Sequence, residues 1–228
     1  VDIGANVGDT VAAFIRHTKS NVICVEPTRK FHNLCRKNID GFGHYYSDRI
    51  SLVNAYVSDI ETTEFVSEIV DGTAIKRVVE SSAEAPTYTL PHIVKKCGYC
   101  MEQLALVKVD TDGYDADCIF SMGEALHKLS PVLYWENQID ENTQHEKYTR
   151  MGEFLEQSGY HNFFIFDNYG NYICQTKLKG YIEINDYLKR ILNKKSTRSF
   201  AYVDVLAAKD CDVDICSKTI KNYLQQYG

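Results

Sequence analysis

The sequence predicts an α/β fold that is built on a doubly wound, mostly parallel sheet and carries an antiparallel hairpin near its C-terminus. Three observations predict it. Apolar segments with the character of buried strands alternate along much of the chain with amphipathic segments of helical period. A glycine-rich turn, GANVG, follows the first of these strands. Two strand-like segments late in the chain flank the turn sequence DNYGN, which is typical of antiparallel neighbours.

The first ten residues, VDIGANVGDT, predict the end of a buried strand, a turn and the start of a helix. Gly4 and Gly8 lack a Cβ, so the backbone between them can pass close to a ligand. Asp9 or Thr10 is a suitable N-cap for a helix that we expect over Val11–Thr18. This stretch therefore predicts a ligand-binding turn between the first strand and the first helix.

A second strand is expected over Asn21–Val25 and ends in Glu26 and Pro27. In a strand–turn–helix–strand unit, an acid about twenty residues after the glycines lies beside the turn and can accept both ribose hydroxyls of a nucleoside. A dinucleotide requires the fingerprint G-x-G-x-x-G, and this fingerprint fails because position 6 is asparagine. The spacing D-x-G-x-x-x-G, which starts at Asp2, instead resembles motif I of class I S-adenosylmethionine-dependent methyltransferases.

An amphipathic helix over Thr28–Ile39 leads to a third strand, Ile50–Val53, which we expect to continue to Asp59. The carboxyl ends of neighbouring parallel strands open into one crevice. Residues 54–57 would therefore border the adenine of the ligand, and Ser58 with Asp59 could hydrogen-bond to its edge. A plain turn explains Ser58 and Asp59 equally well.

The segment LALVKVDTDGYD, which begins at Leu104, predicts a buried parallel strand, a tight turn and a helix over Tyr114–Lys128. Its carboxylates Asp110, Asp112 and Asp115 repel one another unless a cation or hydrogen-bond donors balance them. Asp110 follows the strand on the crevice side and is our first candidate for a general base, with Asp112 second. Helix capping is the alternative for Asp112 and Asp115, and it is the better explanation for Asp115.

Several later elements follow from hydrophobic period and turn signals. A less patterned insertion is expected over Glu61–Tyr88, before a helix that begins at Leu90. The elements expected after that are a strand over Pro131–Asn137, a helix over His145–Gln157, a hairpin of His161–Phe166 with Tyr172–Cys174, a helix over Tyr181–Asn193, a strand over Phe200–Ala208 and a helix over Asp212–Tyr227.

Three segments, in order and at fitting spacing, carry a family resemblance: VDIGANVGDT, then VEP at the end of the second strand, then VKVDTDGYDADCI. With the late segment FAYVDVLAA, they resemble the FkbM family of S-adenosylmethionine-dependent methyltransferases. The resemblance implies a seven-stranded, Rossmann-like class I methyltransferase fold in a single domain over residues 1–228. It also implies methyl transfer to a hydroxyl oxygen, commonly that of a sugar or a natural product.

The same resemblance indicates which residues would hold S-adenosylmethionine. The first motif would hold the amino-acid end of the cofactor, Glu26 its ribose, and the residues after the third strand its adenine. The predicted cofactor-binding residues are thus Asp2, Gly4, Ala5, Asn6, Gly8, Thr10, Glu26, Pro27, Asn54, Ala55, Ser58 and Asp110.

The strand over Pro131–Asn137 ends with an acid and an amide, Glu136 and Asn137, beside the expected strand end at Asp110. These three residues resemble the metal-ligand arrangement of catechol-type methyltransferases. Oxygen ligands of this kind suit Mg²⁺, which would bind the acceptor oxygens and lower the pKa of the hydroxyl. The alternative is that Asp110 orients the acceptor directly and that no metal binds.

Composition limits the remaining function classes. The 228 residues are 44% hydrophobic and 25% charged, as in globular domains, and the formal net charge of −6 argues against a nucleic-acid partner. No apolar run approaches the roughly 18 residues needed to cross a bilayer, and no signal peptide precedes the first motif, so we expect a cytoplasmic protein. Because the chain starts inside its first strand, we also expect a further N-terminal segment or domain in the natural protein.

The predicted function is therefore O-methylation of a hydroxyl on a small molecule or a glycan, with S-adenosylmethionine as cofactor. A non-catalytic module that binds a nucleoside or a glycan within a larger glycan-building protein is the alternative from a different class.

Overall fold

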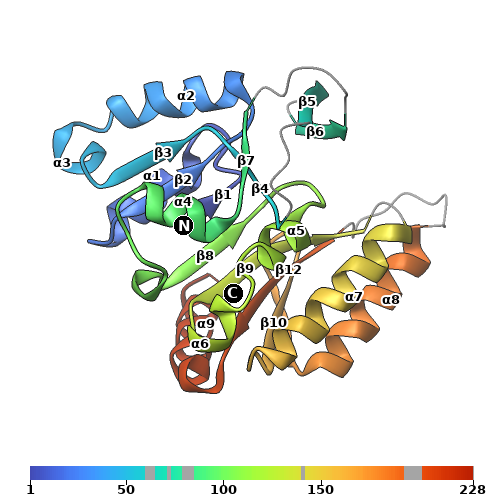
Figure 1. Cartoon of the computed structure of the whole chain (residues 1–228). Coiled ribbons are helices and arrows are strands. Elements are labelled where there is room, and N and C mark those ends of the chain that lie inside the picture. The colour runs from blue at the N-terminus through green and yellow to red at the C-terminus, as the bar shows by residue number, and fades with distance from the viewer. Residues whose placement is uncertain (60–64, 71–72, 79–84, 140–141, 193–201, 228) are drawn as a thin grey trace. The chain divides into compact units, whose positions relative to one another are not determined.

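A computed structural model of the chain describes residues 1–59, 65–70, 73–78, 85–139, 142–192 and 202–227. The chain divides into two compact units, Val1–Gly123 and Glu124–Gly228 (Figure 1). The expected insertion over Glu61–Tyr88 and the expected strand from Phe200 lie partly outside the described residues.

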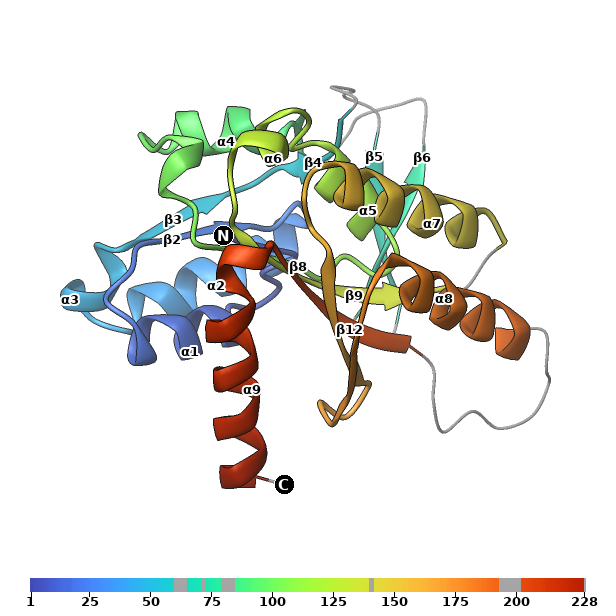
Figure 2. The ribbon, with the colours of Figure 1, turned by 90° about the horizontal axis from the view of Figure 1, so that it is seen from below.

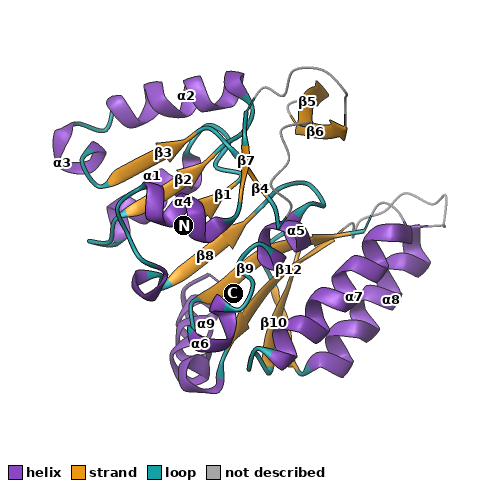
Figure 3. Ribbon diagram, in the orientation of Figure 1, coloured by secondary structure: helices purple, strands orange, loops and turns teal. Residues whose placement is uncertain are grey.

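From β1 to β3 the first unit alternates strands with helical segments, as the sequence predicts (Figure 3). Its elements in chain order are β1 (Asp2–Ile3), α1 (Asp9–His17), β2 (Val22–Val25), α2 (Arg29–Asp40), α3 (His44–Ser47), β3 (Ile50–Val53), β4 (Tyr56–Val57), β5 (Phe65–Val70), β6 (Thr73–Val78), β7 (Thr87–Tyr88), α4 (Leu90–Lys96), the 3₁₀-helix η1 (Met101–Gln103), β8 (Leu106–Val109) and α5 (Asp115–Phe120).

Four of these strands form a parallel array in the order β8-β1-β2-β3. Asp2 of β1 is the register partner of Cys24 in β2 and of Lys108 in β8. All four residues of β2 are buried, which explains why this strand has an unbroken apolar sequence. Parallel strands end at the same edge, so the carboxyl ends of β1, β2, β3 and β8 all face one side of the unit.

Helices cover both faces of this array. Figure 2 shows α1 and α2 on one side of β2 and β3, and α4 on the other. Val11 and Ile15 of α1 are buried in one cluster with Val22 and Cys24 of β2. The amphipathic period of α1 therefore serves to attach the helix to the strand that follows it.

The second unit contains α6 (Ala125–Lys128), β9 (Val132–Gln138), α7 (Asn142–Gln157), β10 (Asn162–Asp167), β11 (Tyr172–Thr176), α8 (Leu178–Leu192), β12 (Tyr202–Ala208), the 3₁₀-helix η2 (Asp210–Asp212) and α9 (Val213–Tyr227). Its strands lie in the order β11-β10-β12-β9, and every neighbouring pair is antiparallel. The hairpin predicted around the sequence DNYGN is confirmed as β10 and β11, with Asp167 accepting from the amides of Tyr169 and Asn171.

An aromatic cluster forms the centre of the second unit. The rings of Phe163 and Tyr181 stack at 4.9 Å between centroids, and Trp135 meets Tyr181 edge-on at 6.0 Å. All three side chains are fully buried. Stacked and edge-on pairs of this kind contribute about 0.5–1.5 kcal/mol each beyond their buried area.

The predicted start of the first helix is wrong. Neither Asp9 nor Thr10 is the N-cap: α1 begins at Asp9, and its N-cap is Gly8. Gly8 has a φ of +87° and its carbonyl accepts from the amide of Ala12. The left-handed conformation is inexpensive for glycine and lets the chain enter the helix directly from the turn.

Two further boundaries differ from the predictions. The third strand does not continue to Asp59: β3 ends at Val53, and Tyr56–Val57 form β4, which pairs with β7. The helix expected over Tyr114–Lys128 is interrupted, because α5 ends at Phe120 and Gly123 takes a φ of +53°. A short α6 follows in the second unit.

The fold-class prediction is confirmed: the protein is α/β, with a parallel array in the first unit and an antiparallel array in the second. Within the described residues the two arrays contain four strands each, so the expected number of seven strands is wrong by one. None of the described helices is both long and apolar enough to span a membrane.

We predict that Gly4→Ala destabilises the protein by more than about 3 kcal/mol, because two penalties add. Gly4 has a φ of +80°, and a Cβ there would lie 1.8 Å from the carbonyl oxygen of Asp110, which directly follows the neighbouring strand β8. Urea unfolding of the wild type and the variant measures the change in the free energy of unfolding.

Gly98→Ala is the matched control. Gly98 has a φ of +81°, but a Cβ there meets nothing within 4 Å. Only the left-handed penalty applies, so we expect a loss of about 1–2 kcal/mol. Equal losses for the two variants would show that contact between β1 and β8 does not restrict position 4.

Candidate functional site

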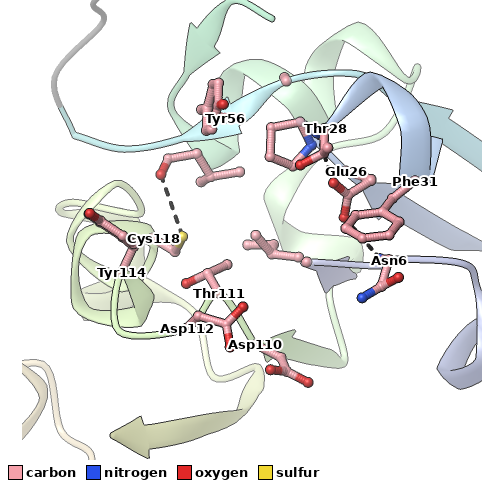
Figure 4. A pocket seen from close by; sticks show the side chains of 15 residues that line it. Asn6, Glu26, Thr28, Phe31, Tyr56, Asp110, Thr111, Asp112, Tyr114 and Cys118 are labelled. Atoms are coloured by element: carbon pink, nitrogen blue, oxygen red, sulfur yellow. Dashed lines mark hydrogen bonds between the residues drawn. The ribbon is translucent and has the colours of Figure 1, made fainter. Parts of the chain in front are cut away.

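A pocket in the first unit lies at the carboxyl ends of β1, β2 and β8, where the parallel array predicts a ligand (Figure 4). Its lining includes Gly4 and Asn6 of the turn after β1, Glu26 after β2, and Asp110 and Asp112 after β8. The lining residues are Ile3, Gly4, Asn6, Glu26, Pro27, Thr28, Phe31, Ala55, Tyr56, Val57, Asp110, Thr111, Asp112, Tyr114 and Cys118.

Glu26 is held in this pocket by two backbone amides. Its Oε2 accepts from the amide of Asn6 at 2.9 Å, and its Oε1 accepts from the amide of Thr28 at 2.8 Å. The side chain is almost completely buried, and burial raises the pKa of its carboxyl although both amide bonds oppose that shift. Each carboxylate oxygen has a second lone pair, so Glu26 can accept from two further donors in the pocket.

The turn that carries Glu26 is fixed from behind by Asn54. Its amide nitrogen donates to the carbonyl of Glu26 at 2.9 Å and to that of Pro27 at 2.7 Å. Asn54 therefore supports the pocket rather than lining it. These two hydrogen bonds also account for the end of β3 at Val53, because they hold Asn54 against the turn after β2 and not in line with the strand.

The turn after β1 places its backbone toward the same pocket. Asn6 has a φ of +46°, a conformation that asparagine tolerates better than most residues. The amide of Gly8 donates to the carbonyl of Ala5 at 2.8 Å and closes the turn. A Cβ on Gly8 would lie 3.0 Å from Sγ of Cys35 in α2, so close helix packing also favours glycine there.

Acidic side chains occupy the pocket end of β8. Asp110 and Asp112 are exposed, and Asp112 has a φ of +52°. Asp110 accepts a hydrogen bond from the ammonium of Lys108 at 3.0 Å. Lys108 is therefore the cation that balances the carboxylate of Asp110, and the sequence predicts the need for such a partner without identifying it.

Asp115 has a different position from Asp110 and Asp112. It is fully buried and accepts from the hydroxyl of Thr111 and the amide of Gly113, each at 3.3 Å. Burial raises the pKa of this carboxyl to about 7. Asp115 is the first residue of α5 and fixes the turn before it; the N-cap of the helix is Tyr114. The prediction that Asp115 caps the helix is thus wrong in detail.

The structure brings together seven of the predicted site residues in the pocket lining: Gly4, Asn6, Glu26, Pro27, Ala55, Asp110 and Asp112. Six predicted cofactor-binding residues are not among those that line it: Asp2, Ala5, Gly8, Thr10, Asn54 and Ser58. Ser58 is buried, and its hydroxyl donates to Asp59 at 3.3 Å. Asp2 is fully buried and lies 3.3 Å from the ammonium of Lys108.

Sequence reasoning missed part of the remaining walls of the pocket. Phe31 comes from the buried face of α2, and Cys118 comes from α5, where its thiol donates to the carbonyl of Val57 at 3.4 Å. Tyr56 of β4 also lines the pocket and lies within residues 54–57, which were expected to border the adenine. Phe31 belongs to no motif and has an ordinary core character in the sequence, whereas Cys118 lies near the end of the segment VKVDTDGYDADCI. The missed residues that the motifs could have indicated are Thr28, next to Glu26-Pro27, and Ile3, Thr111, Tyr114 and Cys118 within the quoted segments.

The predicted metal ligands are divided between the two units, with Asp110 in the first and Glu136 and Asn137 in the second. Asn137 is fully buried, and its amide oxygen accepts from Tyr181 at 2.7 Å and from Trp135 at 3.2 Å. Its amide nitrogen donates to Asn185 at 2.8 Å. These bonds disfavour Asn137 as a metal ligand, and no group of three metal-ligating His, Cys, Asp or Glu side chains occurs among the described residues.

The donor set of the pocket fits a nucleoside cofactor that carries no phosphate. Glu26 offers carboxylate oxygens suited to a ribose diol, and Phe31, Tyr56 and Val57 offer an apolar wall suited to a purine. The described lining residues include no lysine, arginine or histidine, which a pyrophosphate would favour. Fold and site together define a class I methyltransferase-like protein.

The family comparison agrees with this class. The model of the methyltransferase FkbM domain matches residues 2–162. The chain therefore belongs to the FkbM family of S-adenosylmethionine-dependent methyltransferases, and the family resemblance carried by its motifs is confirmed. A comparison with curated proteins finds no match.

Two methyltransferases of known structure are similar to this chain at low sequence identity. The methyltransferase FkbM from Methylobacillus flagellatus KT is 12% identical with a TM-score of 0.45, and the match covers 90% of this chain and 42% of that one. The plantazolicin methyltransferase BamL, solved with a triazolic desmethylPZN analog and SAH, is 9% identical with a TM-score of 0.47 over 92% of this chain and 76% of that one. This chain thus spans less than half of the FkbM structure from Methylobacillus flagellatus KT.

We predict that Glu26→Gln weakens the binding of S-adenosylhomocysteine by roughly 10- to 100-fold, the range expected for lost hydrogen bonds to a charged group. Glutamine retains one acceptor oxygen, so it cannot accept from both backbone amides and from a ribose as the carboxylate can. Calorimetric titration gives the dissociation constant, and thermal unfolding shows whether the variant is folded. Replacement by alanine is less informative, because it leaves the amides of Asn6 and Thr28 without their acceptors.

Glu102→Gln is the control, because Glu102 is exposed on η1 and does not line the pocket. Its dissociation constant should equal that of the wild type. A folded Glu26→Gln protein with wild-type affinity would remove the assignment of Glu26 to the ribose.

Proposed function

We propose that this chain is an S-adenosylmethionine-dependent O-methyltransferase that acts on a hydroxyl of a sugar, a glycan or a natural product. The observation that carries the proposal is one pocket in which the buried carboxylate of Glu26 and the exposed carboxylates of Asp110 and Asp112 line the same cavity. The first provides for a nucleoside, and the other two provide for an acceptor that must lose a proton.

In this proposal the cofactor lies across the carboxyl ends of β1 and β2. Glu26 accepts from the ribose hydroxyls, Phe31, Ala55 and Tyr56 contact the adenine, and Gly4 with Asn6 borders the amino-acid end. Three residues that do not line the pocket support it: Asp2 fixes β1, Gly8 fixes the turn after β1, and Asn54 fixes the turn after β2. When bound, S-adenosylmethionine supplies an electrophilic methyl group on a sulfonium centre.

The residues of the chain have two tasks in the transfer. They hold the acceptor oxygen in line with the methyl group, and proximity of this kind supplies much of the rate. They also take the proton that the hydroxyl loses as its oxygen forms the new bond to carbon. Asp110 is the proposed base because it is exposed at the pocket, and Asp112 is the second candidate.

A hydroxyl acceptor is proposed because the available bases at the pocket are carboxylates. Sugars and polyhydroxylated natural products match the aromatic residue Tyr114 of the lining, which offers a face for ring stacking. Mg²⁺ bound by Asp110, Glu136 and Asn137 remains a separate proposal, which the hydrogen bonds of Asn137 disfavour.

The second candidate function is a non-catalytic module that binds a nucleoside or a glycan in a larger protein. It shares the Glu26 half of the site and differs in needing no carboxylate at β8.

We predict that Asp110→Asn lowers kcat by at least about 100-fold, the usual contribution of a general base, while affinity for S-adenosylhomocysteine stays near that of the wild type. The assay follows transfer of a labelled methyl group to a panel of glycosides and phenolic natural products, with Mg²⁺ and with EDTA. Asp112→Asn is assayed in parallel, because loss of activity there instead would make Asp112 the base.

Asp214→Asn serves as the control, since Asp214 is exposed on α9 in the second unit. It should keep wild-type kcat. Near-normal turnover by both Asp110→Asn and Asp112→Asn would contradict the catalytic role of this acidic segment. A wild-type chain that binds the cofactor and methylates no acceptor would favour the binding module, and equal rates with Mg²⁺ and EDTA would contradict the metal site.

A further inference from the structure

Three charged side chains lie in a row on one face of the first unit. Asp2 in β1 and Lys108 in β8 are register partners on neighbouring strands, and Asp110 follows Lys108 by two residues, on the same side of the backbone. The ammonium of Lys108 lies 3.3 Å from Oδ1 of Asp2 and 3.0 Å from Oδ2 of Asp110. The ammonium therefore bridges a carboxylate of the core and a carboxylate of the pocket.

Burial changes steeply along this row. The side chain of Asp2 is fully buried, that of Lys108 is 13% exposed, and that of Asp110 is 46% exposed. Within the described part of the chain, no hydrogen bond reaches either oxygen of Asp2. An ion pair with a buried carboxylate costs desolvation free energy and contributes little net stability compared with apolar residues of the same size. The ion pair of Lys108 with Asp2 is therefore better explained by a need for a cation beside Asp110 than by a contribution to stability.

We propose that Lys108 is a positioning residue, held by Asp2, that fixes the orientation of the Asp110 carboxylate at the pocket. The inference rests on the proposed role of Asp110 as the base. An exposed aspartate at a strand end can occupy several rotamers, and only some of them point its oxygens at an acceptor. The hydrogen bond from a mostly buried ammonium selects one of them. Asp2 in turn keeps the long lysine side chain from turning toward solvent.

The charge state of Lys108 agrees with this role. Burial by itself would lower the pKa of the ammonium, but the charges of Asp2 and Asp110 and its hydrogen bond to Asp110 together raise it above the usual value. Lys108 thus stays protonated and keeps donating to Asp110.

The same geometry gives Asp2 a different role from the one that the motif implies. Asp2 does not line the pocket, and its partner is Lys108. Its action on the site is through Lys108 and Asp110.

The test uses variants of the whole chain that separate positioning from folding. Lys108→Met alone would leave the charge of Asp2 buried without a counter-ion and could unfold the protein. The informative variant is therefore the double replacement Asp2→Asn with Lys108→Met, which removes both buried charges together. Lys108→Arg keeps a cation between the two carboxylates and serves as the conservative rescue. Lys179→Met, which breaks an exposed pair with Glu183, is the matched control.

We expect the double variant to unfold cooperatively and to bind S-adenosylhomocysteine as the wild type does. Its kcat should fall by about tenfold or more, as expected for a misplaced reacting group. Lys108→Arg should recover most of this loss, and Lys179→Met should show none. A folded double variant with wild-type kcat, or one that loses cofactor affinity and kcat in parallel, would overturn the proposal.

Crystal structures of the wild type and the double variant give a readout that needs no acceptor. The Asp110 carboxylate should have one defined position in the wild type and a changed or multiple position in the double variant. An unchanged carboxylate would overturn the proposal. If the wild type binds the cofactor but methylates nothing, the proposed function fails, and the two crystal structures still decide whether Lys108 orients Asp110.

Discussion

The contact between β1 and β8 at Gly4 is the constraint on which the candidate site depends. The carbonyl of Asp110 occupies the space that a Cβ at position 4 would need, and the amide of Asp110 donates to the carbonyl of Ile3 at 3.0 Å. This close approach brings the turn after β1 and the acidic segment after β8 into the lining of one pocket. A larger residue at position 4 would separate the strand ends, and the two sequence motifs would no longer meet.

A second constraint is the placement of charge around that contact. Glu26 joins the turns after β1 and β2 through the amides of Asn6 and Thr28, while Lys108 joins Asp2 to Asp110. The carboxylate of Glu26 is thus held by backbone amides, and that of Asp110 is held by the ammonium of Lys108. The first arrangement leaves acceptor capacity for neutral hydroxyl donors, and the second leaves a carboxylate exposed beside them. A cofactor with a ribose and an acceptor with a hydroxyl both suit this distribution.

Local sequence predicted the parts of this arrangement that depend on local chemistry. The glycines at positions 4 and 8 predicted a turn with positive φ, and the acid at position 26 predicted a strand end beside that turn. The structure places Gly4 and Glu26 in the pocket. The predicted boundaries of helices and strands were wrong where a tertiary contact determines the boundary. Asn54 ends β3 by bonding to the turn of Glu26, and no periodicity in the sequence indicates that bond.

Sequence reasoning placed residues 54–57 beside the pocket but missed the wall that α2 contributes, for the same reason. Phe31 has the helical period of a core residue, and only the packing of α2 beside the turn makes it part of the site. Lys108 stands out in the sequence as a charge inside an apolar strand. Its partners could not be identified there, because Asp2 lies on the neighbouring strand β1 and Asp110 lies beyond the end of β8. The measurement that tests the central claim most directly is a calorimetric titration of the wild-type chain with S-adenosylhomocysteine and, separately, with NAD. Binding of S-adenosylhomocysteine in the micromolar range without binding of NAD is the predicted result, and preference for NAD would contradict the account of the pocket.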